Sequence, residues 1–421
     1  MKEFQLLHKM NITVHRGLRQ IGGCITEIST ATSRVFIDMG QNLPGMGEPT
    51  TPEQDKKMVS DLFERNKREN EAVFYSHIHE DHIGLFWAVP QDVPQYLGED
   101  SKAMFKAKHE LIKMSKQDSK EEEKLLKIID KMHTWPRPEI RCNPTPMHVG
   151  DITVTPYYCS HSTHDSHMFL IEADGKRIWH TGDFRTHSFL GERLYKMLEA
   201  YATGIDTLII EGTMLNREDK CITEAEVSLK MAHVMRAFKH VFVLVSATNI
   251  ERLESIVKAA RQSRHKVYVA SGYLRNTMEI FGKEGERNKM YKCFIQRPGY
   301  AKLPDYVPQG DFVIAVGTGK LDDVRKTLPK LDPAETLLIY ASWDGYYKDP
   351  EQVAANPKYK EFRELFSNVV DIHTSGHANR DALARVIRLI NPKEAIIGIH
   401  KDEGTSLKDL EISEELKTIV R

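Results

Sequence analysis

Cysteine is scarce and scattered in this sequence. Five cysteines occur among 421 residues, and no two of them form a Cys-x-x-Cys pair. An odd, dispersed set of this kind excludes a disulfide framework and argues against a thiolate zinc site. Residues 1–5 also lack the long apolar segment of a secretory signal. We therefore expect a cytoplasmic protein.

Long apolar runs and a strong net charge are missing as well. No stretch approaches the roughly 20 apolar residues that a transmembrane helix requires, so we expect no membrane partner. The 59 basic and 60 acidic residues nearly cancel, which argues against a uniformly basic nucleic-acid coat and leaves a local basic groove open. No phosphate loop of the GxxxxGK[ST] type occurs. The length suits two domains, or one domain with a large insertion.

Histidine, by contrast, is abundant, and its densest cluster follows a predicted buried strand. The chain has 19 histidines, and the motif His-x-His-x-Asp-His at 77–82 comes just after the apolar run 72–75. In an extended segment the first two histidines point to the same side, because side chains alternate. They can bind one ion while the adjacent aspartate and histidine bind a second, and a chance cluster of histidines is the alternative. The four side chains are His77, His79, Asp81 and His82.

Apolar periodicity predicts a chain of alternating strands and helices. Strands are expected at 11–15, 23–28, 34–38, 72–75, 153–157, 168–173, 177–180, 207–210, 241–245, 266–270, 311–316, 336–341, 369–372 and 395–399. Helices are expected at 52–69, 251–260 and 380–390, and another begins at Thr223, where Glu226 completes a capping box. Strands that alternate with helices after residue 213 imply a parallel sheet in this part.

Residues 101–135 are the most charged stretch of the chain. Lys, Glu and Asp dominate, with apolar residues at helical spacing. The pattern predicts solvated amphipathic helix, arranged as two arms. A substrate-facing lid is the functional alternative to a plain solvated face.

Three further metal-capable residues follow predicted strands far along the sequence: His161, Asp183 and His400. A two-ion site can be assembled from them, with Asp183 as the bridge between the ions. An all-His/Asp set suits zinc or manganese. Spacing alone does not choose among His161 and its neighbours His164 and His167, and Asp183 could also be an ordinary turn residue. One ion would be held by His77, His79 and His161, and the other by Asp81, His82 and His400.

This set of motifs resembles the metallo-β-lactamase fold, an αββα sandwich. Asp38, in Ile-Asp-Met-Gly, is similar to the early structural aspartate of that fold. The α/β insert and the C-terminal motifs resemble the β-CASP nucleases, and among these the ribonuclease J family. The resemblance implies an α/β protein with a metallo-β-lactamase domain split into residues 1–212 and 367–421, and a β-CASP domain inserted at 213–366.

The resemblance also implies roles for residues outside the metal cluster. Glu211 in Leu-Ile-Ile-Glu-Gly-Thr and His377 in Ser-Gly-His-Ala look like two of the extra family motifs, and His400 like the third. We expect Asp81, Glu211 and His377 to be catalytic, with His377 as general acid and Glu211 as its orienting carboxylate. The segment Ser-Ala-Thr-Asn-Ile-Glu-Arg at 246–252 is similar to the phosphate-contacting segment of the family, although such residues often only cap helices. The expected substrate contacts are Ser246, Thr248, Asn249, His373 and Ser375, with Arg252, Arg275 and residues 261–266 gripping the RNA backbone.

The implied function is metal-dependent hydrolysis of RNA phosphodiester bonds, by a 5′-to-3′ exonuclease, an endonuclease or both. Two divalent ions, zinc or else manganese, would be the cofactors. Single-stranded RNA would be the partner, with bases stacking on aromatic residues such as Trp343 and Tyr346. Assembly into a homo-oligomer is left open. The alternatives are a hydrolase of DNA, which His400 disfavours, and a hydrolase of a small-molecule ester, which would not need the insert. A third is a non-catalytic RNA-binding scaffold, which would have lost metal ligands that this chain keeps.

Overall fold

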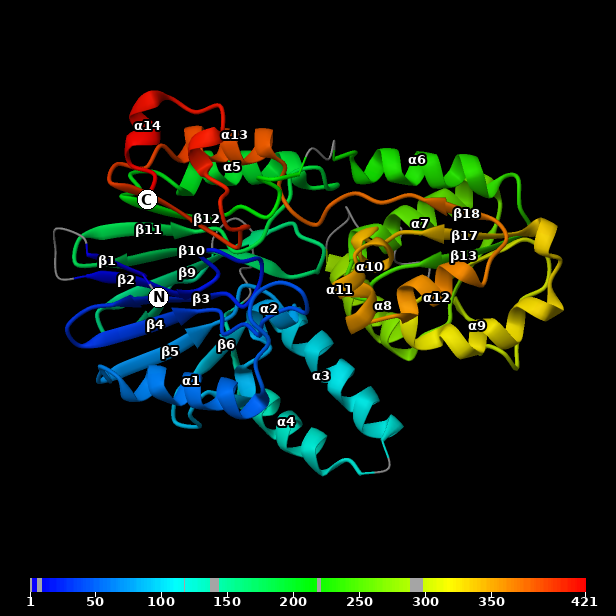
Figure 1. Cartoon of the computed structure of the whole chain (residues 1–421), viewed down its shortest axis with the longest axis horizontal. Coiled ribbons are helices and arrows are strands. Elements are labelled where there is room, and N and C mark those ends of the chain that lie inside the picture. Colours follow the sequence, from blue (N-terminus) through cyan, green and yellow to red (C-terminus); the bar gives the residue numbers. More distant parts are fainter. Residues whose placement is uncertain (1, 6–9, 117, 137–143, 218–220, 288–297) are drawn as a thin grey trace.

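Two lobes make up the protein (Figure 1). The computed structural model describes residues 2–5, 10–116, 118–136, 144–217, 221–287 and 298–421. Within these ranges the strands form three sheets, two of them stacked in the first lobe and the third alone in the second lobe. The predicted α/β class, a two-sheet sandwich with an inserted α/β domain, is therefore confirmed. No helix in the described part of the chain is both long and apolar enough to cross a membrane.

The two sheets of the first lobe draw their strands from both ends of the chain. The first sheet has the order β1 (Lys2–Gln5), β2 (Asn11–Arg16), β3 (Ile25–Ser29), β4 (Ser33–Ile37), β5 (Asn70–Phe74), β6 (Gln95–Leu97) and β7 (His133–Thr134). The second has the order β19 (Ala395–Ile399), β12 (Thr207–Glu211), β11 (Lys176–His180), β10 (Ser166–Ala173), β9 (Ile152–Cys159) and β8 (Met147–Val149). In the second sheet β12 pairs in parallel with both β11 and β19, so the C-terminal strand completes it.

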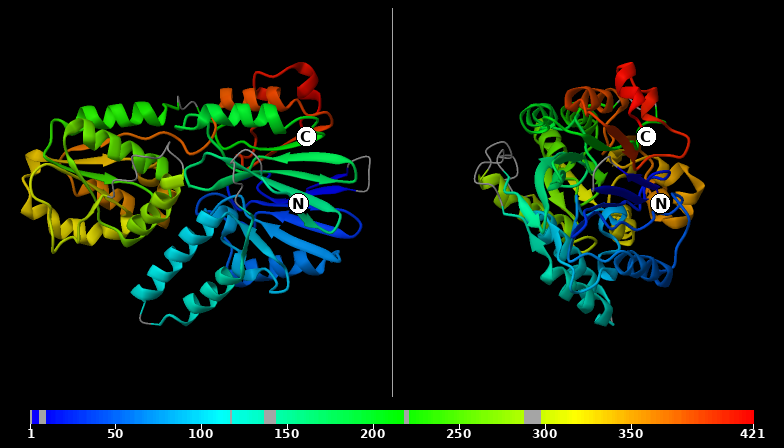
Figure 2. Two further views of the ribbon diagram at one scale, coloured as in Figure 1. Left: turned by 180° about the vertical axis from the view of Figure 1, so that it is seen from behind. Right: turned by 90° about the vertical axis from the view of Figure 1, so that its left-hand side faces the viewer.

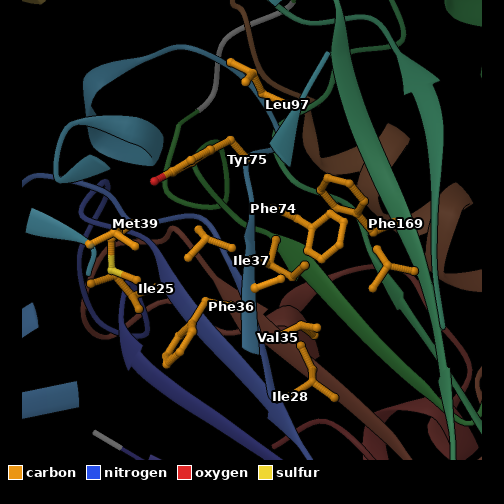
Figure 3. Packing of buried hydrophobic residues seen from close by; sticks show 14 of the residues in the cluster. Ile25, Ile28, Val35, Phe36, Ile37, Met39, Phe74, Tyr75, Leu97 and Phe169 are labelled. Atoms are coloured by element: carbon orange, nitrogen blue, oxygen red, sulfur yellow. The ribbon is translucent and has the colours of Figure 1, made fainter. Parts of the chain in front are cut away.

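Apolar side chains from both sheets fill the space between them (Figure 3). Every residue of β3 and β4 is buried, because these strands have a helix on one face and the second sheet on the other. The contact across the sandwich is direct: the rings of Phe74 and Phe169 lie 6.2 Å apart at their centroids. This rigid core fixes the ends of the strands, and the candidate site lies at those ends.

Helices cover the outer faces of the sandwich (Figures 1 and 2). They are α1 (Pro52–Glu64) on the first sheet, and α5 (Gly191–Tyr201), α13 (Arg380–Ile390) and α14 (Glu414–Thr418) over the second. The helix predicted at 52–69 ends early, at Glu64, and residues 65–69 lead into β5. The apolar face predicted for α13 is confirmed, since Leu383, Val386, Ile387 and Ile390 are all buried. Helix α5 was not predicted, although it packs on α13.

The second lobe is a parallel sheet with helices on both sides. Its strand order is β15 (Gly299–Tyr300), β14 (Lys266–Val269), β16 (Phe312–Val316), β13 (His240–Leu244), β17 (Thr336–Tyr340) and β18 (Val369–Asp371). Its helices include α6 (Glu224–Met235), α7 (Ile250–Ser263), α8 (Gly272–Arg287), α9 (Leu321–Thr327), α10 (Gly345–Lys348), α11 (Pro350–Ala355) and α12 (Lys358–Glu364). The capping box of Thr223 and Glu226 at the start of α6 is confirmed.

Strand β18 corrects the predicted end of the insert. The domain boundaries predicted from the sequence assign this strand to residues 367–421, in the first lobe. Instead it pairs in parallel with β17 and forms an edge of the third sheet. A short apolar strand carries no signal for which sheet it joins, because either sheet offers a parallel neighbour.

The charged stretch forms a helical hairpin of α3 (Glu99–Ser115) and α4 (Lys120–Lys131) that projects from the first lobe (Figure 1). The two predicted arms are therefore present. Helix α3 is not merely solvated, because it packs along α8 of the second lobe, where Leu111 lies against Gly272. Lys108 of α3 also forms an ion pair with Glu80, beside the histidine motif. The hairpin thus connects the two lobes close to the candidate site.

Candidate metal centre

The histidine motif occupies the tight turn between β5 and the short helix α2 (Glu80–Ile83). Neighbouring loops hold this turn through backbone hydrogen bonds. The amides of Cys24, Met39 and Gln41 donate to the carbonyls of Asp81, His82 and Glu80 at 2.9, 2.8 and 2.9 Å. The turn is therefore fixed by backbone contacts that do not depend on its metal-capable side chains.

Asp38 orients the last histidine of the motif. It has a left-handed backbone, with φ of 64°, directly after β4. Its carboxylate accepts hydrogen bonds from the Ser76 amide at 2.7 Å, the Ser76 hydroxyl at 2.8 Å and Nδ1 of His82 at 2.7 Å. With Nδ1 engaged, Nε2 of His82 faces the centre of the site. The structural role implied for Asp38 matches this geometry.

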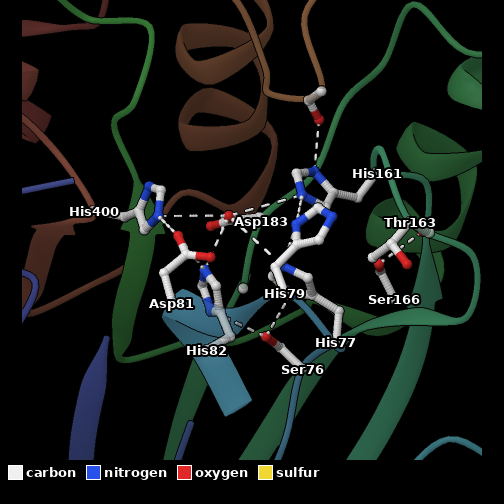
Figure 4. Close-up of polar contacts among 12 residues, drawn as sticks. Ser76, His77, His79, Asp81, His82, His161, Thr163, Ser166, Asp183 and His400 are labelled. Carbon is white, nitrogen blue, oxygen red and sulfur yellow. Dashed lines mark hydrogen bonds and ion pairs between the residues drawn. The ribbon is translucent and has the colours of Figure 1, made fainter. Parts of the chain in front are cut away.

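One group of nitrogen atoms comes from His77, His79 and His161 (Figure 4). Nδ1 of His79 lies 3.1 Å from Nε2 of His77 and 3.2 Å from Nε2 of His161. Burial, reinforced by the neighbouring histidines, lowers the pKa of His77 and of His161 well below the usual value. Burial likewise lowers the pKa of His79 to about 4. Three neutral rings thus direct their lone pairs into one small space, an arrangement that a cation stabilises.

A second group contains Asp81, His82, Asp183 and His400. Nε2 of His400 lies 3.0 Å from Oδ2 of Asp81, and Nε2 of His82 lies 3.0 Å from Oδ2 of Asp183. Nε2 of His82 is buried and makes no hydrogen bond within the described part of the chain. A divalent cation between these atoms would satisfy the nitrogen and both carboxylates, so the residues fit such an ion.

Asp183 lies between the two groups. Its Oδ2 is 4.0 and 3.9 Å from Nε2 of His77 and His161, and 3.7 Å from Nε2 of His400. Burial alone would raise the pKa of Asp183, but the neighbouring histidines, led by His400 and His82, hold it well below the usual value. Asp183 is therefore an anion placed to contact both groups at once.

Besides His82, three of the clustered histidines donate through Nδ1, which leaves Nε2 for the site. Nδ1 of His77 donates to the Ser76 hydroxyl at 3.0 Å, and that of His161 to the carbonyl of Gly376 at 2.6 Å. Nδ1 of His400 donates to the hydroxyl of Thr213 at 2.6 Å, which in turn donates to the His400 carbonyl at 3.2 Å. Partners of this kind fix the tautomer and the ring orientation of a ligand. Sequence reasoning missed Thr213 and Gly376, because no local pattern links them to their histidines.

His377 and Glu211 form a pair at the edge of the cluster. Nδ1 of His377 lies 2.9 Å from Oε2 of Glu211 and 3.7 Å from Oδ2 of Asp183. Glu211 is fully buried at the end of β12, and its other oxygen accepts from the Phe184 amide at 3.0 Å. Burial lowers the pKa of His377, but the two carboxylates outweigh it and the pKa lies above the usual value. The pair can hold a proton next to the candidate metal centre.

Comparison with known proteins identifies the architecture. The family described as "Beta-lactamase superfamily domain" matches residues 53–244, a range that contains every clustered residue of the two metal groups except His400. The chain has the metallo-β-lactamase fold. A crystal structure of a protein of unknown function from Enterococcus faecalis V583 covers 94% of both chains with a TM-score of 0.69 at 18% identity, which supports the fold alone.

Most of the length of this chain is also similar to ribonuclease J. Ribonuclease J of Helicobacter pylori strain J99 is 24% identical over 404 residues, which cover 91% of this chain and 55% of that protein. Ribonuclease J of Thermus thermophilus is 23% identical over 398 residues, covering 90% of this chain and 66% of that protein. The chain thus spans about half to two thirds of the length of these relatives. The resemblance predicted from the sequence motifs is confirmed.

The three histidines that follow β9 in the sequence have different partners in the structure. His161 joins the first nitrogen group, whereas Nε2 of His164 bonds to Oδ2 of Asp100 at 3.0 Å. The ring of His167 packs against Trp135. The structure thus chooses among three histidines that spacing could not separate.

The predicted substrate-contacting residues line the junction of the two lobes, and some of them have structural partners. Asn249 caps α7 through the Arg252 amide at 3.2 Å. The hydroxyls of Ser246 and Thr248 bond to each other at 3.1 Å. Ser375 accepts from the His377 amide at 3.0 Å. Capping a helix is the alternative role that the sequence pattern had also allowed for these residues, and Asn249 has it.

Arg252 does not grip a substrate backbone, and this expectation was wrong. Its side chain is fully buried, and its guanidinium binds both oxygens of Glu224 and the carbonyls of Ala341 and Thr374. It also contacts Nδ1 of His373 at 3.4 Å. A sequence motif does not reveal burial, so an internal ion pair was taken for an exposed cation.

Proposed function

We propose that the protein is a metal-dependent ribonuclease that hydrolyses phosphodiester bonds of single-stranded RNA. One observation carries the proposal: two groups of His and Asp ligands share Asp183, and the Glu211–His377 pair lies beside them. The similarity to ribonuclease J along about nine tenths of the chain supports RNA as the substrate. A cytoplasmic location is part of the proposal.

The metal centre would hold two divalent ions, zinc or else manganese. His77, His79 and His161 would bind one, and Asp81, His82 and His400 the other, with Asp183 between them. When bound, two such ions activate a water molecule and neutralise charge on the phosphate oxygens. An all-nitrogen group and a mixed nitrogen and carboxylate group fit borderline ions better than magnesium or calcium, which prefer oxygen ligands.

His377 would supply the proton that the leaving 3′ oxygen needs. The carboxylates of Glu211 and Asp183 raise the pKa of the imidazole, which favours its protonated form, and Glu211 fixes its orientation at 2.9 Å. General acid catalysis of this kind contributes about 10²–10⁴-fold to a rate. Ser246, Thr248, Asn249, His373 and Ser375 remain proposed contacts to the RNA.

The test uses purified protein with zinc or manganese and a 5′-labelled single-stranded RNA carrying either a 5′-monophosphate or a 5′-triphosphate. Single-stranded DNA of the same sequence and a small ester are the comparison substrates. RNA cleavage is expected. Turnover of the small ester with no cleavage of any RNA would overturn the proposal. Mononucleotide release would indicate exonuclease action, and internal fragments endonuclease action.

Asp81→Ala tests the second ion, and Glu80→Ala is its matched control. Both residues lie in α2, but Glu80 points to Lys108 and is absent from the ligand groups. Asp81→Ala should bind fewer ions by elemental analysis, stay folded by circular dichroism and lose RNA cleavage, whereas Glu80→Ala should keep both ions and activity. Full metal content and activity in Asp81→Ala would refute the assignment of the second ion.

A further inference from the structure

Three side chains of the second lobe and its linker lie beside the Asp81 half of the metal centre. Arg217 belongs to the segment after β12, six positions beyond Glu211. Trp343 lies just before α10, and Tyr346 lies in it. The Arg217 guanidinium lies 5.0 Å above the Trp343 ring. The rings of Trp343 and Tyr346 meet edge to face at 5.3 Å. We call these three residues the Arg217 wall.

The Tyr346 phenol is the buried polar group of this wall. Burial raises its pKa, the Asp81 carboxylate adds to this effect, and the Arg217 guanidinium opposes it. The phenol ring is held in place by stacking on Tyr359, with centroids 4.5 Å apart and planes at 15°. A side chain fixed in this way presents its hydroxyl at a defined position beside the site.

The surrounding backbone makes the wall rigid. Gly345 is packed against the Trp343 indole so closely that a Cβ there would lie 2.2 Å from Cζ2 of the ring. Helix α11 follows directly, and its Gln352 donates from Nε2 to the carbonyl of Pro44 at 2.6 Å. The loop that contains Pro44 also packs on the metal turn, because Leu43 and Asp81 both lie against Gly22. The wall and the metal turn are thus anchored to each other.

The Arg217 guanidinium has the face of the Trp343 ring as its partner, and no ion pair or side-chain hydrogen bond joins it to another residue that the structure describes. Most other arginines near the site, such as Arg185 and Arg252, are buried in ion pairs. A guanidinium stacked on an indole is oriented and keeps its forked N–H donors free, which suits a phosphate group.

We propose that the Arg217 wall is a binding subsite for the nucleotide that flanks the scissile bond on the Asp81 and His400 side. Arg217 binds the flanking phosphate, and Trp343 and Tyr346 contact the base and sugar of the same nucleotide. His161 lies across the cluster from Asp81 and His400 (Figure 4). The His377 ring packs on both His161, at 4.9 Å, and His400, at 5.4 Å, so the proposed acid lies between the two groups of ligands. The inference rests on the proposed ribonuclease function and adds a subsite for the substrate.

Binding is measured first, in a His377→Ala background with zinc present, by fluorescence anisotropy of a labelled ten-nucleotide single-stranded RNA. Adding Arg217→Ala should weaken RNA binding about tenfold, because one charge-assisted, bidentate contact to a phosphate is lost. It should also reduce the slope of log affinity against log salt by about 0.7, the value for one phosphate contact on a single strand. Arg325→Ala is the matched control, because Arg325 is an exposed arginine of the same lobe, paired with Asp322 and Glu361. An unchanged affinity and slope in Arg217→Ala would overturn the subsite.

Catalysis then separates the subsite from the metal centre. In the otherwise unaltered protein, Arg217→Ala and Tyr346→Phe should raise KM for RNA with kcat within about twofold, whereas Tyr347→Phe should change neither. Hydrolysis of bis(p-nitrophenyl) phosphate, which has no flanking nucleotide, should stay the same in all variants. An equal loss on both substrates would show that Arg217 acts on the metal centre and would overturn the subsite. RNA that binds through Arg217 but is not cleaved would refute the proposed function while supporting the subsite.

Discussion

Thr213 determines which nitrogen of His400 faces the metal centre. Its hydroxyl accepts from Nδ1 of His400 and donates to the carbonyl of the same residue. Thr213→Val keeps the shape of the side chain and removes both bonds, so we expect the affinity for the second ion to fall about 10–100-fold. Zinc titration against a competing chelator measures this. Thr207→Val is the control, since the Thr207 hydroxyl is buried and has no hydrogen-bond partner among the described residues. Equal zinc affinity in both variants would show that the backbone alone orients His400.

The proton on His377 should set the alkaline limit of activity. Its pKa is raised because the Glu211 and Asp183 carboxylates outweigh burial. An acid must be protonated to act, so activity should be present below this pKa and be lost as pH rises through it. Glu211→Gln removes the carboxylate that raises the pKa of His377 most, while the burial that lowers this pKa remains. We therefore expect the alkaline limb of the kcat profile to move to lower pH.

His377→Ala is the companion variant for this assignment. It should lower kcat by about 10²–10⁴-fold and flatten the alkaline limb, with metal content unchanged by elemental analysis. A loss of bound metal in either variant would instead place His377 or Glu211 among the ligands. An alkaline limb at the same pH in Glu211→Gln would show that another group controls it.

At the scale of elements, the start of α6 carries a buried ionic network that joins the lobes. Glu224 accepts from Arg185 at 2.9 Å and from Arg252 at 3.0 Å, and all three side chains are fully buried. Arg185 comes two residues after Asp183 in the first lobe, whereas Arg252 lies in α7 of the second. Glu251 accepts from the other arm of Arg185 at 2.8 Å. The network therefore holds the Asp183 loop to the second lobe.

Glu224→Gln should destabilise the protein by about 3–5 kcal/mol at pH 7, because it removes the carboxylate that both buried guanidinium groups bind. Arg185 keeps its ion pair with Glu251, but Arg252 has no other ion pair among the described residues. Burial raises the pKa of Glu224, but Arg252 and Arg185 outweigh it and hold the pKa well below the usual value. Its contribution is therefore complete above the unfolded pKa of about 4.3 and is lost as pH falls toward the folded pKa. Urea unfolding should show a difference between wild type and variant that shrinks as pH falls below about 4.

The control for this element is Glu226→Gln in the capping box of the same helix, where the side chain is exposed and a smaller loss is expected. A difference between wild type and Glu224→Gln that stays constant from pH 7 to pH 3 would contradict the ionic account. A loss no larger than that of Glu226→Gln would show that the network contributes little to stability.

The features that could be predicted from the sequence have local signals. The capping box at Thr223, the apolar face of α13 and the positions of the clustered His and Asp residues at strand ends all follow from short-range patterns. Three other features depend on contacts between residues far apart in sequence. They are the sheet that β18 joins, the burial of Arg252 and the hydrogen bond between the Thr213 hydroxyl and Nδ1 of His400. Such contacts produce no periodic pattern in the sequence, so they cannot be predicted from a single sequence.

At the scale of the whole molecule, the candidate metal centre joins segments that the chain keeps far apart. Its proposed ligands come from the loop after β5, the loop after β9, the residues after β11 and the end of β19. They span residues 77 to 400, and both sheets of the sandwich contribute. An ion bound to the folded protein alone stabilises it by mass action, about 2.7 kcal/mol at a free concentration one hundred times Kd.

Removal of metal should therefore loosen every one of these loops together. Chelation is expected to lower the Tm and to raise amide hydrogen exchange at 76–84, 160–164, 181–185 and 398–401 in parallel, because lone pairs and carboxylates brought this close repel one another without a cation. Zinc added in excess should reverse both effects in wild type. In Asp81→Ala, excess zinc should restore protection from amide exchange at 160–164, next to the first group of ligands. Residues 398–401 should still exchange faster than in wild type. Protection that returns equally at both segments in Asp81→Ala would mean that the two groups hold a single ion.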